Sequence, residues 1–192
     1  GRSFPVEYRY SPIPKNQNLE DYVTKQVRWL LDNDQGSILV FLPGISSIKS
    51  VEQKLQCLDE SIQVCPLHGG LDFHQQQMAI TPSKEGQRKV VLATNIAETS
   101  LTIEGIRLVV DSGYERIAKF DLKSGITKLE QKKIAQSSAE QRAGRAGRMT
   151  AGVCVRLYSL EQLNQQPSRP KPEILTSELS NLVFDLAQWG VI

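Results

Sequence analysis

The run Gln141-Arg-Ala-Gly-Arg-Ala-Gly-Arg148 contains the residue types of this sequence that are best suited to chemistry. Successive residues of a helix are turned by about 100°, so Gln141, Arg145 and Arg148 would share one face and Arg142 would be turned away from it. Guanidiniums held on such a face suit a transferring phosphoryl group, because they neutralise its developing negative charge. The run therefore predicts Gln141, Arg145 and Arg148 as catalytic residues and Arg142 as a structural one.

The other side of this predicted helix carries small residues, Ala143, Gly144, Ala146 and Gly147. Each glycine destabilises a helix by about 1 kcal/mol relative to alanine. The two glycines therefore indicate that close packing, and not helix propensity, determines the residue types here. The plain alternative is a solvated basic helix surface. The small-residue side favours the functional interpretation, because it lets the helix lie close to a sheet.

Two polar segments follow apolar runs of strand type. The first, Ala93–Glu104, contains Thr94, Asn95, Ser100 and Thr102, which can bind phosphate or ribose without adding charge. The second contains His68-Gly69-Gly70, whose glycines let backbone N–H groups approach an anion. In open α/β sheets, ligands lie beyond the carboxyl ends of the strands, which favours a functional role over ordinary turns and caps.

Several kinds of site are missing from the sequence. It contains no Gly-Lys dipeptide, so it has no phosphate-binding loop of the G-x-x-x-x-G-K-[ST] type, and it contains no Asp-Glu-x-His. Its three cysteines lack C-x-x-C spacing, and its two histidines, His68 and His74, have no further metal ligands close in sequence. We therefore expect no metal site and no disulfide framework in the chain.

The spacing of apolar residues predicts the elements that position these segments. Strands alternating with helices of 10–15 residues indicate a doubly wound, mostly parallel α/β sheet with helices on both faces. We expect strands at 6–10, 37–41, 62–67, 89–93, 106–110 and 153–158, and helices or turns at 18–31, 45–58, 72–80 and 95–99, with a helix that starts at the capping pair Ser138 and Gln141.

The alternation breaks at Gly113, where two β-biased stretches, 114–120 and 126–134, flank a turn-rich segment and predict a protruding hairpin. Three prolines within 164–172 predict a linker, which divides the chain into a domain at 1–163 and the start of a truncated downstream domain at 173–192. The chain begins on glycine without an initiator methionine, so we expect it to be a piece of a longer protein.

The composition indicates a soluble, globular chain. Of 192 residues, 40% are hydrophobic and 23% charged, and no apolar run approaches the ~18 residues of a membrane span. The formal net charge is only +2, but residues 110–150 contain nine Lys or Arg against five Asp or Glu. A polyanion is therefore expected near that segment, and the cysteine usage favours a cytoplasmic location.

Four segments together resemble one family. Phe41-Leu-Pro-Gly44, the string TNIAETSLTI at 94–103, Val110-Asp-Ser-Gly113 and QRAGRAGR at 141–148 look like motifs IV, V, Va and VI of the DEAH/DExH-box helicases of superfamily 2, in the same order. The resemblance covers about residues 1–160, and the sequence from Pro172 resembles the start of the family's winged-helix region. Within the family the chain looks most like the bacterial HrpB-type helicases.

The resemblance implies a second RecA-like lobe of a two-lobe motor. ATP, or another NTP, would bind between this lobe and an N-terminal RecA-like lobe that carries the phosphate loop and most of the Mg contacts. Gln141 would orient the attacking water, and Arg145 and Arg148 would be arginine fingers. Facing the nucleotide would be Ser100, Thr102, Glu104 and Ile80, the last where many relatives have an aromatic residue.

The resemblance also implies a single-stranded nucleic acid as partner, with RNA favoured over DNA. Its backbone would be held by Thr94, Asn95, His68, Gly69 and Gly70. The alternative is a nucleic-acid-binding α/β module without ATPase activity. The face of Gln141, Arg145 and Arg148 favours the helicase, because a module that only binds has no need of it. A small-molecule enzyme is disfavoured, since no nucleophile and base are paired.

Overall fold

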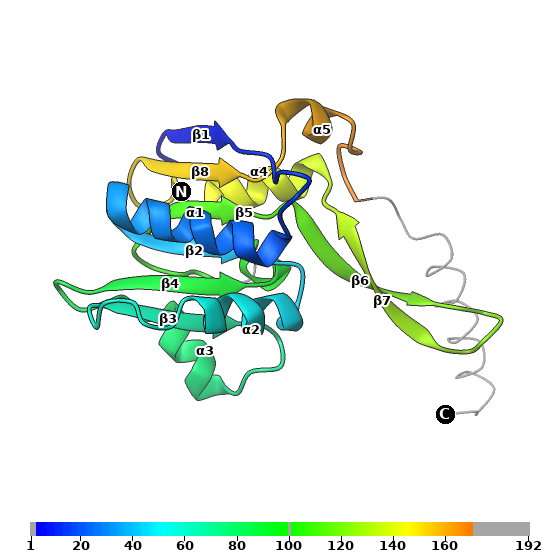
Figure 1. Cartoon of the computed structure of the whole chain (residues 1–192), viewed down its shortest axis with the longest axis horizontal. Helices are drawn as coiled ribbons and strands as arrows, with labels where there is room; N and C mark the ends of the chain where they lie inside the picture. The colour runs from blue at the N-terminus through cyan, green and yellow to red at the C-terminus, as the bar shows by residue number, and fades with distance from the viewer. Residues whose placement is uncertain (1–2, 100, 171–192) are drawn as a thin grey trace.

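Six parallel strands form the sheet at the centre of the molecule, as the computed structural model shows for residues 3–99 and 101–170 (Figure 1). The strand order is β1-β8-β5-β2-β4-β3. This confirms the doubly wound, parallel α/β architecture expected of a RecA-like lobe. The strands are β1 (Val6–Tyr10), β2 (Ser37–Phe41), β3 (Ile62–Leu67), β4 (Arg88–Ala93), β5 (Ile106–Asp111) and β8 (Gly152–Arg156).

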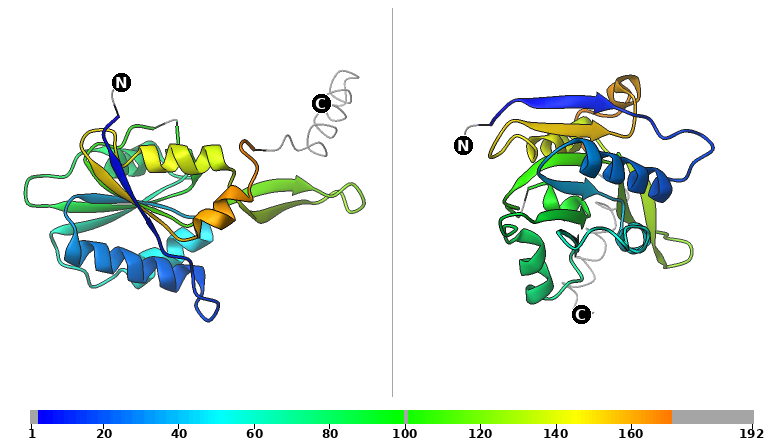
Figure 2. Two further views of the ribbon diagram at one scale, coloured as in Figure 1. Left: turned by 90° about the horizontal axis from the view of Figure 1, so that it is seen from above. Right: turned by 60° about the vertical axis from the view of Figure 1, so that its left-hand side comes forward.

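Helices cover both faces of this sheet, as Figure 2 shows from above for α1 and α4. One face packs against α1 (Leu19–Asn33) and α2 (Ile45–Lys54), and the other packs against α3 (Phe73–Ile80) and α4 (Gln136–Gly144). The strands β2 and β8 are buried along their whole length, because both of their faces are covered. Among the described residues, no helix has both the length and the apolar character that a membrane crossing requires.

A β-hairpin projects from the carboxyl edge of the sheet as an arm (Figures 1 and 2). Its strands β6 (Tyr114–Phe120) and β7 (Thr127–Lys133) pair antiparallel, as predicted. Its base is fixed at Gly113, which has φ +84° and where a Cβ atom would lie 2.6 Å from the Tyr158 ring. No other residue type combines this backbone conformation with so close an approach of an aromatic ring.

The predicted boundaries of α4 are wrong at both ends. The helix begins at Gln136, without a side-chain cap, rather than at the pair Ser138 and Gln141. Its first amides are satisfied from far along the chain, because Gln136 N–H and Ser137 N–H each donate at 2.9 Å to the carbonyls of Pro167 and Ser168. The residues next to Gln136 in the sequence do not indicate such a cap.

The helix also ends earlier than predicted, at Gly144, and Arg148 lies beyond it. Arg145 and Ala146 donate to carbonyls three residues back, which tightens the last turn. At Gly147 a Cβ atom would lie 2.4 Å from the Phe4 carbonyl, so the chain there passes close against the start of the domain. Two short elements complete the fold, the 3₁₀ turn η1 (Asn95–Ala97) and α5 (Leu160–Asn164).

Candidate functional site

The carboxyl edge of the sheet brings two of the predicted segments together. Leu67, at the end of β3, is in register with Ala93, at the end of β4, and Thr94 N–H donates to Leu67 O at 3.2 Å. The loops that follow these strands are therefore neighbours. Asn95, Gly69 and Gly70 are exposed, and Thr94 and His68 are partly exposed. The residues predicted to hold a nucleic-acid backbone thus form one accessible edge.

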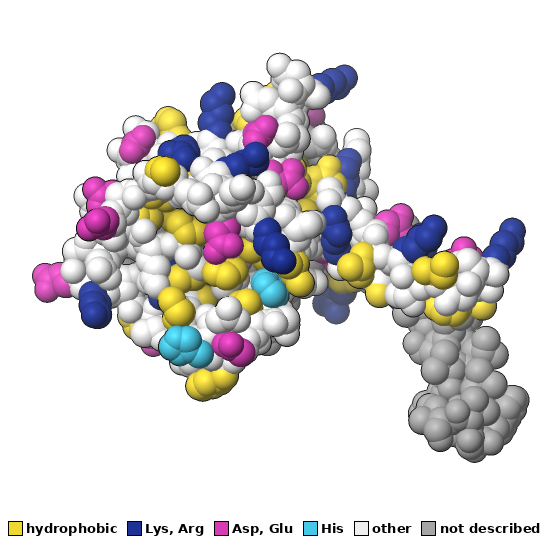
Figure 3. Space-filling model, turned by 60° about the horizontal axis from the view of Figure 1, so that its bottom comes forward, with side chains coloured by type: hydrophobic (Ala, Val, Ile, Leu, Met, Phe, Trp, Pro, Cys, Tyr) yellow, Lys and Arg dark blue, Asp and Glu magenta, His cyan; other side chains and the backbone are white. Residues whose placement is uncertain are grey.

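The His68 side chain closes the loop after β3. Its Nδ1 accepts a hydrogen bond from Gly70 N–H at 3.1 Å. Burial and the charge of Lys49 lower the pKa of His68 below its ordinary value, and Glu52 opposes them. The imidazole is therefore uncharged at neutral pH, and it contributes to the loop by shaping the backbone. Both histidines lie on the side of the molecule seen in Figure 3, with the hairpin extending beyond them as an arm.

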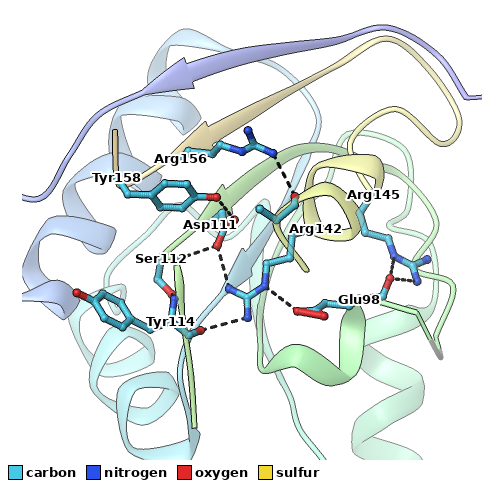
Figure 4. A network of polar contacts seen from close by, with 10 residues as sticks. Glu98, Asp111, Ser112, Tyr114, Arg142, Arg145, Arg156 and Tyr158 are labelled. Atoms are coloured by element: carbon cyan, nitrogen blue, oxygen red, sulfur yellow. Dashed lines mark hydrogen bonds and ion pairs between the residues drawn. The ribbon is translucent and has the colours of Figure 1, made fainter. Parts of the chain in front are cut away.

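Arg145 lies just after α4, with its side chain 8% exposed. Its Nε donates to Glu98 O at 2.8 Å, and its Nη2 donates to the same oxygen (Figure 4). Its Nη1 is buried and has no hydrogen-bond partner among the described residues. A buried charged donor without a partner is costly, so it marks a place where an anion would be stabilised.

Gln141 and Arg148 are both exposed on either side of Arg145. Burial, followed by the neighbouring charge of Arg148, lowers the pKa of Arg145. The positive charge of Arg148 thus acts on Arg145 in the direction opposite to that of Glu98. Because α4 ends at Gly144, the shared face of Gln141, Arg145 and Arg148 is not a continuous helix face as predicted. Arg145 and Arg148 both belong to the turn that follows the helix.

Arg142 is the centre of a buried polar network (Figure 4). Its guanidinium is 2.9 Å from a carboxylate oxygen of Glu98 and 2.9 Å from one of Asp111, and it also donates to Tyr114 O at 3.1 Å. The Phe41 ring lies against it, 4.9 Å from the guanidinium carbon. Arg142 thus joins η1, β5 and the hairpin base, in keeping with the structural role predicted for it.

Asp111 and Glu98 complete this network. The second carboxylate oxygen of Asp111 accepts from Tyr158 Oη at 2.7 Å, and Gly113 N–H donates to the first at 2.8 Å. Burial raises the pKa of Glu98, while Arg142 lowers it. The sequence did not predict Glu98 and Asp111 as partners of Arg142, or Tyr158 as a partner of Asp111. The one available signal was the position of Asp111 at the end of an apolar strand.

Of the residues predicted to face a nucleotide, Ile80 lies on the side of the sheet covered by α3 and α4. Ile80 and Leu101 are partly exposed and pack against the core that also contains Ala143 and Ala146. Thr102 and Glu104 are exposed in the loop before β5. Ser100 and residues 173–192 lie outside the described residues. The described part of the chain contains no group of three residues arranged to hold a metal ion.

The six-stranded parallel sheet with helices on both faces defines the class of protein as a RecA-like α/β domain. Residues 15–150 match the family described as helicase conserved C-terminal domain. The chain belongs to this family, and it is of the DEAH/DExH type.

Several relatives bear this out. The chain is 49% identical to the ATP-dependent RNA helicase HrpB of Escherichia coli K12 over 191 residues, which cover 99% of the chain and 24% of that protein. It is 35% identical to the ATP-dependent RNA helicase HrpA homolog of Haemophilus influenzae, covering all of the chain and 15% of that protein. The crystal structure of the E. coli DExH-box NTPase HrpB superposes with a TM-score of 0.89 over 99% of the chain. The chain spans a quarter or less of the length of these relatives.

Proposed function

We propose that this chain is the second motor lobe of an ATP-dependent RNA helicase, in which Arg145 and Arg148 are the arginine fingers for ATP hydrolysis. The observation that carries the proposal is the buried Arg145 Nη1, which has no partner among the described residues while Arg148 is exposed beside it. Arg148 also forms no ion pair among the described residues. The local excess of positive charge suits a triphosphate.

The chemistry assigned to these residues is electrostatic. As ATP is split, charge develops on the transferring phosphoryl group and the leaving oxygen, and fixed guanidiniums stabilise it without reorganising. Gln141, exposed one turn before Arg145, would orient the attacking water. Thr102 and Glu104 would face the nucleotide. The Mg ion would be held mainly by the N-terminal lobe.

The exposed edge formed by Thr94, Asn95 and the His68–Gly70 loop would hold the backbone of single-stranded RNA. Its hydroxyl, amide and backbone N–H groups can donate to phosphates without reading bases. RNA is favoured because the relatives are named RNA helicases. A module that only binds nucleic acid would have no need of Gln141 in addition to Arg145 and Arg148.

Arginine substitutions in a protein that contains both lobes test the proposal. We expect Arg145→Ala and Arg148→Ala each to lower the kcat of RNA-stimulated ATP hydrolysis by on the order of 10³-fold, as the loss of an arginine finger does. Arg169→Ala, at an exposed arginine outside the site, is the control and should leave kcat within twofold. Wild-type kcat in both finger variants would contradict the assignment.

A further inference from the structure

Lys89 is a buried lysine that the function described above does not use. It is the second residue of β4, and it is 4% exposed. Its ammonium donates to Met78 O at 2.7 Å, to Ala79 O at 3.4 Å and to Thr81 O. No carboxylate pairs with it among the described residues. A single ammonium thus binds three carbonyls at the end of α3.

These carbonyls need the ammonium because a helix leaves its last carbonyls without partners. Thr81 satisfies only Gln77 O, through its N–H at 3.0 Å and its Oγ1 at 2.6 Å. Pro82 follows and has no N–H to donate. Met78 O has one other contact, from the Cys65 thiol at 3.8 Å. Lys89 therefore caps α3, and its positive charge also suits the negative end of the helix dipole.

The burial of this ammonium is a cost that the cap must offset. Burial lowers the pKa of Lys89 below its ordinary value. A methionine or leucine would fill the same space without desolvating a charge. The lysine therefore fixes the last turn of α3 to β4 through directional hydrogen bonds, which an apolar side chain cannot provide.

The residue enclosed by this cap is Ile80. It lies between the capped carbonyls of Ala79 and Thr81, and its side chain is partly exposed while packing against the core under α3 and α4. The carbonyls bound by Lys89 thus set the backbone on both sides of Ile80. An aliphatic side chain binds a flat ring only through contact area. The position of the Ile80 side chain therefore decides how strongly it would bind a base.

We propose that Lys89 is a positioning residue for the surface that receives the nucleotide base, and that it acts by holding Ile80 in place through the cap of α3. This inference rests on the proposed function, and it takes Ile80 as the nucleotide contact that the family resemblance implies. Lys89 would act on nucleotide binding indirectly, through its hydrogen bonds from β4 to the backbone at the end of α3.

The test compares ligands with and without a base in a protein that contains both lobes. Lys89→Met should weaken ADP binding and raise the KM for ATP by about tenfold, the scale of a lost apolar contact. It should leave the inhibition constant of inorganic triphosphate and kcat within twofold, because neither depends on the base. Lys84→Met, at an exposed lysine of the loop between α3 and β4, is the matched control and should change none of these.

A double-variant cycle shows whether Lys89 acts through Ile80. The single variant Ile80→Ala should weaken ADP binding. The double variant, Ile80→Ala with Lys89→Met, should weaken it no further. Additive losses, or an equal loss of triphosphate binding in Lys89→Met, would overturn the inference. If Lys89→Met does not fold, Ile80→Ala still decides, since unchanged ADP affinity in that variant removes the base contact.

Lys89→Arg keeps a cation with several donors and should retain ADP affinity close to that of the wild type. Loss of ADP affinity in this variant to the level of Lys89→Met would count against the cap. The two proposals fail in different ways. A wild-type protein without RNA-stimulated ATP hydrolysis would overturn the proposed function. An active wild type whose Lys89→Met and Ile80→Ala variants bind ADP normally would overturn only the role of Lys89.

Discussion

Arg142 and Arg145 are three residues apart, yet their guanidiniums have opposite environments. Arg142 is fully buried, and its donors are bound by two carboxylates and a carbonyl. Arg145 keeps a buried nitrogen without a partner among the described residues. The first arrangement is complete in itself, whereas the second would be completed by the anion that the proposed function requires. Residue type alone therefore does not separate structural from functional arginines in this run.

The completeness of the Arg142 network leads to a prediction about stability. Arg142→Met would leave Asp111 buried without its cation, so we expect the free energy of unfolding to fall by about 3–5 kcal/mol. Denaturant unfolding, with amide exchange along β5, would measure it in a protein that contains this chain. Arg148→Ala, at an exposed site, should stay within about 0.5 kcal/mol of wild type. A loss below about 1 kcal/mol in Arg142→Met would show that the network contributes little.

At the scale of elements, strands were predictable from the sequence and the ends of α4 were not. The apolar run at 37–41 is buried on both faces, and local composition is enough to recognise such a strand. The start of α4 depends instead on the carbonyls of Pro167 and Ser168, which lie about thirty residues later in the chain than the amides of Gln136 and Ser137 that donate to them. Its end depends on packing of Gly147 against Phe4.

The parts of the candidate site differ in the same way. The loops after β3 and β4 could be placed at one edge, since the carboxyl ends of parallel strands meet there. The partners of Arg142 lie 44 and 31 residues away, at Glu98 and Asp111, and no periodicity links such positions. The cap formed by Lys89 was missed because a lysine at the start of a strand ordinarily reaches solvent.

Whether the hairpin contributes to the proposed RNA binding can be measured separately. Lys128, Lys132 and Lys133 are exposed on β7 and make no ion pair among the described residues, whereas Lys119 pairs with Glu130 at 3.1 Å. If the hairpin follows the RNA backbone, replacing the three lysines by glutamine should reduce the slope of log K against log salt by about 0.7 for each lost phosphate contact.

Binding isotherms at several salt concentrations would measure that slope. A variant with glutamine at three exposed lysines elsewhere, Lys15, Lys25 and Lys84, controls for net charge and should keep the wild-type slope. An unaltered slope in the hairpin variant would make the hairpin a contact for another domain. The exposed apolar side chains near its tip, Phe120, Leu122, Ile126 and Leu129, would then be the surface of that contact.

At the scale of the whole molecule, the proposed active site is divided between two lobes. The chain supplies arginines, but it contains no phosphate-binding loop, and its described residues contain no metal-ligand cluster. We therefore expect the purified chain alone to hydrolyse no ATP above background, because the fingers have no bound phosphate to stabilise. A phosphate-release assay would measure this, with the Arg145→Ala chain as the control for contaminants. Turnover that the Arg145→Ala change abolishes would contradict the divided site.

The pairing of β1 with β8 also sets the order in which the domain can be completed during synthesis. Val6, at the start of the first strand, pairs with Gly152, at the start of the last strand of the sheet. Ribosomes add about 5–20 residues per second, so β1 waits on the order of ten seconds for its partner. In that interval the exposed aromatic residues Tyr8 and Tyr10 have no strand beside them, and the nascent chain is open to chaperones and to pairing with the wrong edge.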